Sequence, residues 1–394
     1  MAVLEMKPGI FEVGAGDWDR RLFDELIPLP DGTSYNSYLI KGSKKTALID
    51  TVDPSKEDVL LENLSYMGIK NIDFVIANHA EQDHSGCIPL VLTMFPKAKV
   101  VTNKKCMNML KDHLHIEEKK YKVVEDGEEL SLGDKTLEFH FTPWVHWPET
   151  MVTLLKEDKV LFSCDFFGAH TASSQLFKED DDIVYQSAKR YYAEIMMPFR
   201  SPIKSNLKKL KKLEFDIIAP SHGPVYEDPD FIIDAYSEWV SDEVKNEVIV
   251  PYISMHGSTS KMVTHFVDYL IEHGMKVTPY NLTTTDVGNL AMGMVDAATI
   301  VLGTPTVLVG PHPQMVYATS LVNALRPKTK FVSVIGSYGW GGRAVEVIQE
   351  NLTNLQAEMI EPVMVQGHPT RKDMKKVEQL AEEIIKKHKE AGLF

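Results

Sequence analysis

Short apolar runs separated by polar, turn-forming residues fill the chain up to about residue 225. These runs are YLIKG, TALIDT, FVIANH, LEFHFTP, KVLFSCD and FDIIAPSHG. Their length and their β-branched and aromatic content predict β-strands. The next segment, residues 228–247, spaces its apolar residues as an amphipathic helix does. It predicts an acidic helical link between two domains.

From Val248 onward the pattern changes, because strand-like runs alternate with helix-like segments. This alternation predicts a parallel sheet covered by helices on both faces. One predicted helix carries Met262, Phe266 and Leu270 on a single face and is expected to end at Gly274. The final helix, DMKKVEQLAEEIIKKHKEAGLF, also has its apolar residues on one stripe.

Length and composition support a globular protein with two domains. A chain of 394 residues is long for one core, so we expect domains over residues 1–248 and 249–394. Apolar residues make up 44% of the chain, which is an ordinary share. The formal charge of −14 argues against nucleic acid or an anionic membrane surface as the main partner.

The sequence carries no signal for secretion and no membrane span. Its N-terminus lacks the basic and apolar segments of a signal peptide, and its longest apolar stretch, ATIVLGTPTVLVG, is too short to cross a bilayer. Cys87, Cys106 and Cys164 are scattered and form no C-x-x-C pair. We therefore expect no disulfide framework, no iron–sulfur or rubredoxin module, and a cytoplasmic location.

Metal-competent side chains follow four of the predicted strands. His79 follows FVIAN, His146 follows LEFHFTPWV, Asp165 follows KVLFSC, and His222 follows FDIIAPS. Strands hold the loops that follow them rigidly at one edge of a sheet, where sites commonly form. A single histidine is more often a structural residue, but four such strand ends together predict a metal site.

The cluster after the first of these strands is dense enough to serve two metal ions. His79 and Glu81 can point to one side of the turn, while Asp83 and His84 face a second point. The carboxylates make the site hard and anionic, which leaves iron, manganese and zinc open. The predicted ligands are His79, Glu81 and His146 for one ion, Asp83, His84 and His222 for the other, and Asp165 as a bridge.

The remaining histidines of the first domain are not predicted to bind metal. His113 and His115 lie in a charged segment, and His140 lies inside a strand, so we expect all three at the surface. His170 follows Asp165 by five residues and is either a supporting residue or without a role in the site.

A turn typical of phosphate binding opens the second domain. Hydroxyl-bearing residues surround Gly257, which lets the backbone turn tightly. A phosphate at the N-terminus of the following helix would meet free amides and the positive end of the helix dipole. The sequence does not contain G-x-x-x-x-G-K-[ST], so an ATP-type loop is not expected.

Two later loops have the composition of a site for a flat ring. Residues 303–314 and 336–342 follow predicted strands, at the edge where doubly wound sheets bind ligands. Tyr338 and Trp340 can stack on a heterocycle, and the glycines allow close backbone approach. The candidate residues of the phosphate and ring loops are Ser254, Met255, His256, Gly257, Ser258, Thr259, Ser260, Thr304, Pro305, Thr306, Val307, Leu308, Gly310, Ser337, Tyr338, Gly339, Trp340 and Gly341.

The motif HAEQDH at residues 79–84, with the three later ligands behind it, resembles the metallo-β-lactamase fold. Most hydrolases of that superfamily have histidine where this chain has Glu81, and the replacement is similar to the flavodiiron proteins. The second half resembles flavodoxin, although His256 replaces a threonine of the flavodoxin loop. Leu308 and Val309 stand where flavodiiron proteins often have asparagines.

The resemblance implies an α/β fold, with an N-terminal metallo-β-lactamase-like αββα sandwich followed by a flavodoxin-like doubly wound parallel sheet. It implies FMN and two iron ions as cofactors, and reduction of O2 to water, of NO to N2O, or of both. Electrons would come from an external carrier such as rubredoxin, since we expect no fused donor after the final helix. A head-to-tail homodimer or a dimer of dimers is also implied. Tyr192 and Trp147 are candidates to line the gas pocket.

Two other functions are compatible with the residues. One is a zinc hydrolase whose flavodoxin-like half is a redox module, and the other is a flavin electron carrier whose first domain is only structural. Glu81 argues against the hydrolase, because that chemistry commonly uses histidine there. The intact ligand set argues against the carrier.

Overall fold

The computed structural model describes residues 3–394. The chain divides into two compact units, Met1–Val240 and Ser241–Phe394, and each is described by itself. The helix predicted over residues 228–247 is too long. Only the first part of this range is helical, in α7 (Pro229–Trp239), and its last residues belong to strand β17 (Lys245–Tyr252). Strand β17 pairs with a neighbour on each side, and this sheet pairing outweighs the local helical spacing.

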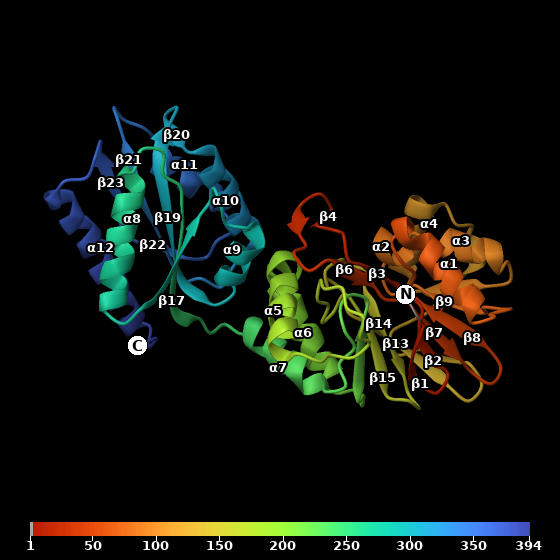
Figure 1. Cartoon of the computed structure of the whole chain (residues 1–394). Helices are drawn as coiled ribbons and strands as arrows, with labels where there is room; N and C mark the ends of the chain where they lie inside the picture. Colours follow the sequence, from red (N-terminus) through yellow and green to blue (C-terminus); the bar gives the residue numbers. More distant parts are fainter. Residues whose placement is uncertain (1–2) are drawn as a thin grey trace. The chain divides into compact units, whose positions relative to one another are not determined.

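The first unit has four layers in the order helix, sheet, sheet, helix (Figure 1). The first sheet contains, in spatial order, β1 (Leu4–Lys7), β2 (Ile10–Glu12), β7 (Tyr38–Lys41), β8 (Thr46–Ile49), β9 (Phe74–Ile76), β10 (Lys99–Thr102) and β11 (Tyr121–Val123). The second sheet contains β12 (Glu129–Ser131), β13 (Thr136–Phe141), β14 (Met151–Leu155), β15 (Val160–Cys164) and β16 (Ile217–Pro220).

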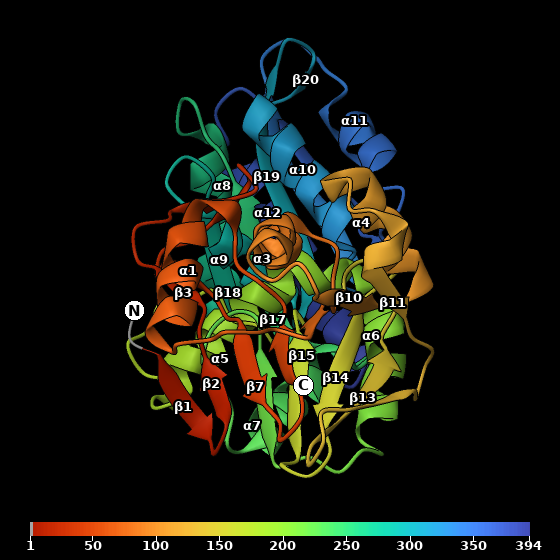
Figure 2. The same ribbon diagram turned by 90° about the vertical axis from the view of Figure 1, so that its right-hand side faces the viewer.

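Helices cover the outer face of each sheet in this unit. The first sheet is covered by α1 (Glu57–Tyr66), α3 (Ile88–Met94) and α4 (Lys104–Leu114), which lie above β1, β2 and β7 in the view of Figure 2. The second sheet is covered by α5 (Asp181–Tyr191), α6 (Arg200–Leu210) and α7 (Figure 1). The unit also contains the short helix α2 (Gln82–Ser85) and two short ribbons, β3 (Ala15–Asp17) with β6 (Thr33–Tyr35) and β4 (Leu22–Phe23) with β5 (Ile27–Pro28).

The central strands of the first sheet are buried on both faces. In β9, Val75 belongs to the core beneath the helices, whereas Phe74 and Ile76 belong to the core between the two sheets. The same alternation separates Leu48 from Ile49 in β8. Burial on both faces explains why these strands read as continuous apolar runs. The strands are thereby held rigidly, and the loops that follow them are held at the sheet edge.

The second unit is a doubly wound parallel sheet. Its strand order is β18 (Lys276–Asn281), β17, β19 (Ala297–Val307), β21 (Phe331–Tyr338) and β22 (Glu358–Met359), with β23 (Val363–Gln366) also on β21 and β20 (Gly310–Pro311) on β19. Helices α8 (Ser258–Glu272) and α12 (Arg371–Glu390) cover one face, and α9 (Val287–Met294), α10 (Pro313–Leu325) and α11 (Ala344–Asn351) cover the other (Figure 1). This order places the phosphate loop at the point where the direction of winding reverses.

Helix α8 has the predicted buried face and the predicted stop. Met262, Phe266 and Leu270 are buried, and Gly274 follows the helix with a φ of +80°. The backbone amide of Met275 donates to the carbonyl of Leu270 at 3.1 Å, which closes the last turn. No helix within residues 3–394 combines the length and the apolar composition that crossing a bilayer requires.

Helix α12 is attached to the sheet by a buried histidine near its end. Besides the predicted apolar stripe, of which Val377, Leu380 and Ile384 are buried, it inserts His388. Nδ1 of His388 donates to Oδ1 of Asn246 at 2.8 Å, and Nε2 accepts from the hydroxyl of Thr299 at 2.6 Å. Burial lowers the pKa of His388 to about 4, and nearby Lys330 acts in the same direction. The folded protein therefore holds this histidine neutral.

Acidification is expected to destabilise the second unit through His388. In the unfolded chain a histidine binds a proton below a pH of about 6.5, whereas folded His388 stays neutral down to a pH of about 4. Its contribution to stability is therefore present above the unfolded pKa and is lost as the pH falls through this window. We expect His388→Gln, which cannot take up the proton, to flatten the pH dependence of Tm there.

Thermal unfolding followed by circular dichroism across this pH window measures the effect. His265→Gln is the matched control, because His265 lies half-exposed on α8 and pairs with Glu378. If Tm depends on pH in the same way in His388→Gln and the wild type through this window, His388 does not contribute to the loss of stability.

Candidate functional site

The structure brings all seven predicted metal ligands of the first unit into two adjoining groups. The four apolar runs that precede them form β9, β13, β15 and β16, and the ligands follow the ends of these strands. Within each group, one atom per side chain lies within 4.8 Å of the corresponding atoms of the others. The groups are His79, Glu81, His146 and Asp165, and Asp83, His84 and His222.

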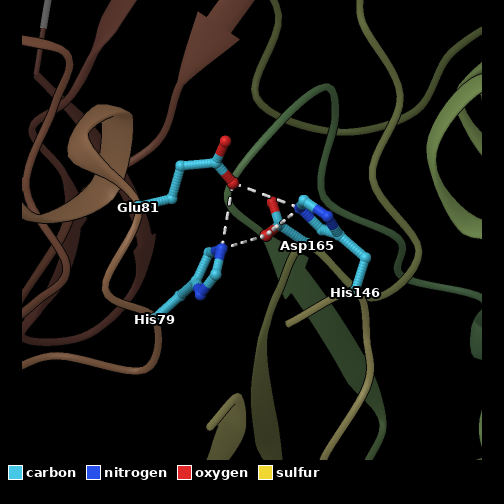
Figure 3. A group of neighbouring side chains, drawn as sticks. All are labelled: His79, Glu81, His146 and Asp165. Carbon is cyan, nitrogen blue, oxygen red and sulfur yellow. Dashed lines mark hydrogen bonds and ion pairs between the residues drawn. The ribbon is translucent and has the colours of Figure 1, made fainter. Parts of the chain in front are cut away.

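The first group surrounds a common point (Figure 3). Oε2 of Glu81 lies 3.0 Å from Nε2 of His79 and 3.2 Å from Nε2 of His146. Oδ2 of Asp165 lies 3.5 Å and 3.6 Å from the same two nitrogens. Two imidazole nitrogens and two carboxylate oxygens thus face one another, which is a donor set suited to a divalent or trivalent cation.

The second group of side chains lies around the other carboxylate oxygen of Asp165, Oδ1. Oδ1 of Asp165 lies 3.1 Å from Nε2 of His84 and 3.3 Å from Nε2 of His222. Asp83 approaches the same nitrogens, with distances of 3.3 Å to His84 and 3.2 Å to His222. Asp165 therefore turns one oxygen to each group, as a carboxylate between two metal ions does. His84 points into this group together with His222.

Several of these atoms are buried without a hydrogen-bond partner among the described residues. They are Oδ1 and Oδ2 of Asp83, Nε2 of His84 and Oδ2 of Asp165. Each lies close to an atom of opposite charge, yet the lone pairs converge on a shared point instead of on a donor hydrogen. Unpartnered buried polar atoms are costly in a folded protein. The donor set therefore fits bound cations.

The electrostatics of the site agree with this interpretation. Burial would lower the pKa of His146 and His222, but the carboxylates around them outweigh it and raise these pKa values to about 9 and about 10. Burial would raise the pKa of Asp165, but the surrounding histidines lower it well below its usual range. The three carboxylates thus attract positive charge strongly, and a metal ion must displace protons from the imidazoles to bind.

One of the two predicted pocket residues does not face this site. The hydroxyl of Tyr192 donates to the backbone carbonyl of Trp239 at 3.2 Å, and its ring packs on Tyr236 and Trp239. The preceding residue, Tyr191, instead donates to Oδ1 of Asp165 at 2.9 Å. Tyr192 therefore packs away from the ligand cluster and Tyr191 contacts it, because the buried face of α5 ends on Tyr191.

A helical stripe could have identified Tyr191 from the sequence. The buried residues of α5 are Val184, Ser187, Ala188 and Tyr191, which follow the spacing of one helix face. After Tyr191 the helix widens into a π-type segment, Tyr192–Met196. The second predicted pocket residue, Trp147, packs its ring against His79 at a centroid distance of 4.9 Å and an angle of 88°.

The other histidines differ partly from expectation. His140 is buried, not exposed, and its Nε2 lies 3.3 Å from Oε1 of Glu138. His170 is also buried, and its ring lies 5.0 Å from that of His222 and 4.8 Å from that of Tyr191. Nδ1 of His170 contacts the hydroxyl of Thr33 at 2.9 Å. Burial lowers the pKa of His170 well below its usual range, so it is a neutral neighbour of the cluster.

Sequence reasoning missed Glu149. Its Oε1 lies 2.7 Å from Nδ1 of His79 and accepts from the backbone amide of Ala80 at 3.1 Å. No spacing rule identifies such a residue, since Glu149 lies far from His79 in the sequence and near the end of the long loop after β13.

The second unit brings its three predicted loops together. The hydroxyl of Thr259, in the first turn of α8, lies 3.2 Å from that of Ser337. The backbone amide of Arg343 donates to the carbonyl of Val309 at 2.6 Å, which joins the two ring loops. A cavity of 340 Å³ lies beside them, with Thr306, Tyr338 and Gly341 in its lining.

The phosphate loop has the expected backbone. Gly257 precedes α8 with a φ of +84°, a conformation that favours glycine, and no atom outside its chain neighbours lies within 4 Å of an added Cβ. The hydroxyl oxygen of Ser254 is buried and has no hydrogen-bond partner among the described residues. An anion at this turn would therefore meet a free hydroxyl and the open amides of the helix.

The ring loops are shorter than predicted. Strand β19 extends to Val307 and forms a hairpin with β20, so Thr304, Pro305 and Thr306 belong to a strand and not to a loop. Strand β21 likewise includes Ser337 and Tyr338. The hairpin turn holds Leu308 at a φ of +47° and Val309 at +74°. Leu308 and Trp340 are 94% and 90% exposed, which places both side chains at the surface of this unit.

Comparisons with known proteins agree with both halves. A family model described as "ODP family beta lactamase" matches residues 33–223. The chain is 34% identical to a nitric oxide reductase of Moorella thermoacetica, over 95% of this chain and 96% of that protein. The solved rubredoxin oxygen:oxidoreductase from Desulfovibrio gigas is 30% identical, with 98% of both chains covered and a TM-score of 0.95. A flavodiiron protein from Giardia intestinalis is 27% identical, with 98% of this chain and 97% of that one covered and a TM-score of 0.90.

The similarity to each of these three proteins covers nearly the whole of this chain and nearly the whole of the other protein. They confirm the predicted fold class, an αββα sandwich of metallo-β-lactamase type followed by a flavodoxin-like sheet. They also favour redox chemistry over the zinc hydrolase, because the full-length relatives are oxidoreductases. The chain therefore belongs to the flavodiiron protein family of oxidoreductases.

Proposed function

We propose that this protein reduces O2 to water, NO to N2O, or both, at a pair of iron ions, with electrons relayed through FMN. The observation that carries this proposal is the donor set in which Asp165 offers one oxygen to each of two groups. The relatives support it, since one is named for nitric oxide and another for oxygen and rubredoxin. The order of preference between the two gases is left to measurement.

Iron is the metal that best suits the cluster. Glu81 adds a third carboxylate to the set, which makes the site harder and more anionic than one with histidine there. Such mixed carboxylate and imidazole sites suit redox-active iron. We propose His79, Glu81 and His146 as ligands of one iron, Asp83, His84 and His222 as ligands of the other, and Asp165 as the bridge.

FMN is the flavin that best suits the second unit. Its single phosphate matches one turn built from Ser254, Gly257 and the first amides of α8. The flat ring would lie between the hairpin turn at Leu308 and the segment of Tyr338 and Trp340. The remaining predicted residues of the phosphate loop are proposed as contacts to the phosphate, and those of the two ring loops as contacts to the ring.

When bound, the flavin and the two irons would supply the electrons that gas reduction requires. The protein's own residues hold a hydrogen-bond donor beside Asp165 and exclude water. Burial and Asp165 raise the pKa of Tyr191 well above its usual range, so its hydroxyl stays protonated and donates a hydrogen bond to Oδ1 of Asp165. Trp147 and Phe23 cover the imidazoles of His79 and His222 and limit the access of water.

The electron donor and the assembly are part of the same proposal. We propose an external one-electron carrier, such as rubredoxin, and a head-to-tail homodimer or a dimer of dimers. The support is the family resemblance, together with a sequence that has no C-x-x-C pair for an iron–sulfur module. A cytoplasmic location is proposed on the same basis.

Gas consumption by the loaded protein tests the function directly. With reduced rubredoxin as donor, we expect consumption of O2 with four electrons per molecule, consumption of NO with one electron per molecule and release of N2O, or both. An electrode for each gas and mass spectrometry of N2O provide the measurement. Protein that contains two irons and one flavin but consumes neither gas would contradict the proposal.

Removing the Glu81 side chain is expected to reduce the bound iron and to leave the flavin bound. In Glu81→Ala the first group loses the oxygen that faces both His79 and His146, so bound iron should fall by about half or more. Flavin should stay bound, because the phosphate and ring loops belong to the other unit. Metal analysis and flavin absorbance of the purified variant measure both. Glu62→Ala, on the exposed side of α1, is the control, and loss of flavin from Glu81→Ala would contradict the assignment.

Gly257→Ala is expected to weaken FMN binding and to leave the iron bound. An alanine at a φ of +84° is strained, so the flavin-free turn is expected to relax, and restoring it on binding costs roughly 1–2 kcal/mol, which weakens FMN binding by about 5- to 30-fold. The iron content should not change. Gly127→Ala is a matched control, since Gly127 has a φ of +80° and equally open surroundings but lies in the first unit. Equal flavin affinity in wild type and Gly257→Ala, measured by fluorescence titration, would exclude this loop.

A further inference from the structure

A buried carboxylate lies directly behind one imidazole of the metal cluster. Oε1 of Glu149 accepts the hydrogen bond of Nδ1 of His79 at 2.7 Å, and both side chains are 0% exposed. The hydrogen bond fixes the imidazole proton on Nδ1 and leaves the lone pair of Nε2 directed at Glu81 and Asp165. The negative charge behind the ring also makes Nε2 a stronger electron donor.

Within residues 3–394, His79 is the one ionisable side chain that pairs with Glu149. Oε1 also accepts from the amide of Ala80, but Oε2 is buried without a hydrogen-bond partner among the described residues. The loop itself is held by its backbone, since Nδ2 of Asn103 donates to the carbonyl of Glu149 at 2.6 Å. A buried charge is costly unless it is compensated. The charge of Glu149 is therefore directed at His79.

The second group of ligands is supported differently. Nδ1 of His222 donates to the backbone carbonyl of Ser34 at 2.7 Å, which is a neutral acceptor. The two groups share Asp165, yet a full negative charge lies behind an imidazole of the first group and only a carbonyl dipole lies behind His222. The hydrogen-bond partners behind His79 and His222 thus differ by a full charge.

We infer that Glu149 is a positioning residue that makes the two metal positions unequal in affinity and in reduction potential. The ion held by His79, Glu81 and His146 is bound more tightly, because the charged hydrogen bond strengthens His79 as a ligand. The same ion is harder to reduce, because added negative charge stabilises the more highly charged metal. This inference rests on the proposed two-iron function.

Glu149→Gln tests the inference with little change in shape. The amide oxygen of glutamine can still accept from Nδ1 of His79, but the charge is gone. Ferrous iron is titrated anaerobically into the metal-depleted full-length protein against a competing chelator. We expect two binding steps in the wild type, and in Glu149→Gln a tighter step weakened by about 10- to 100-fold with the other step unchanged.

A redox titration measures the reduction potentials of the irons, which a purely structural role of Glu149 would leave unchanged. In Glu149→Gln we expect the potential of one iron to become more positive, while the potential of the flavin stays constant. Glu138→Gln is the matched control, because Glu138 lies 3.3 Å from His140 in a similar pair outside the cluster. It should leave both binding steps and both potentials unchanged.

The outcomes separate this inference from the proposed function. Wild-type protein that binds no iron would overturn the proposed function and this inference with it. Wild-type protein that binds two irons, with Glu149→Gln unchanged in affinity and potential, would overturn this inference alone. If Glu149→Gln does not fold, the wild-type titration still decides, because two steps of equal affinity would contradict unequal positions.

Discussion

Three carboxylates and four imidazoles share a buried volume in the first unit, and this concentration of charge is the constraint around which the unit is organised. Asp165 and Asp83 are almost inaccessible, yet some of their oxygens lack hydrogen-bond partners among the described residues. Burial on this scale is unfavourable without a compensating cation. The sheets help to keep these groups together, since His79 follows β9, whose Val75 and Ile76 lie in the cores on opposite faces of the first sheet.

The part of the site that could be predicted from the sequence depends on this support by the strands. A strand is recognised from its apolar run, and a polar residue just beyond it must lie at the sheet edge. His79, Asp165 and His222 follow from that rule alone, because β9, β15 and β16 end within three residues of them. The fold class follows similarly, since the change from short strands to alternating strands and helices is visible near Val248.

The supporting residues could not be found in this way. Glu149 is joined to His79 only by the folded loop that follows β13, and no local pattern records that contact. Tyr191 and Tyr192 are adjacent, and only the face of α5 decides which one reaches Asp165. In the second unit, the extension of β19 into a hairpin depends on pairing with β20, which local propensity did not indicate. Long-range packing therefore determines the details that tune the site.

Metal and flavin analysis of the purified protein, combined with its visible spectrum, tests the central claim most directly. The seven proposed ligands and the proposed phosphate turn predict two irons and one FMN per chain, together with the absorption bands of an oxidised flavin. Two zinc ions per chain, or protein that binds iron but no flavin, would contradict the account.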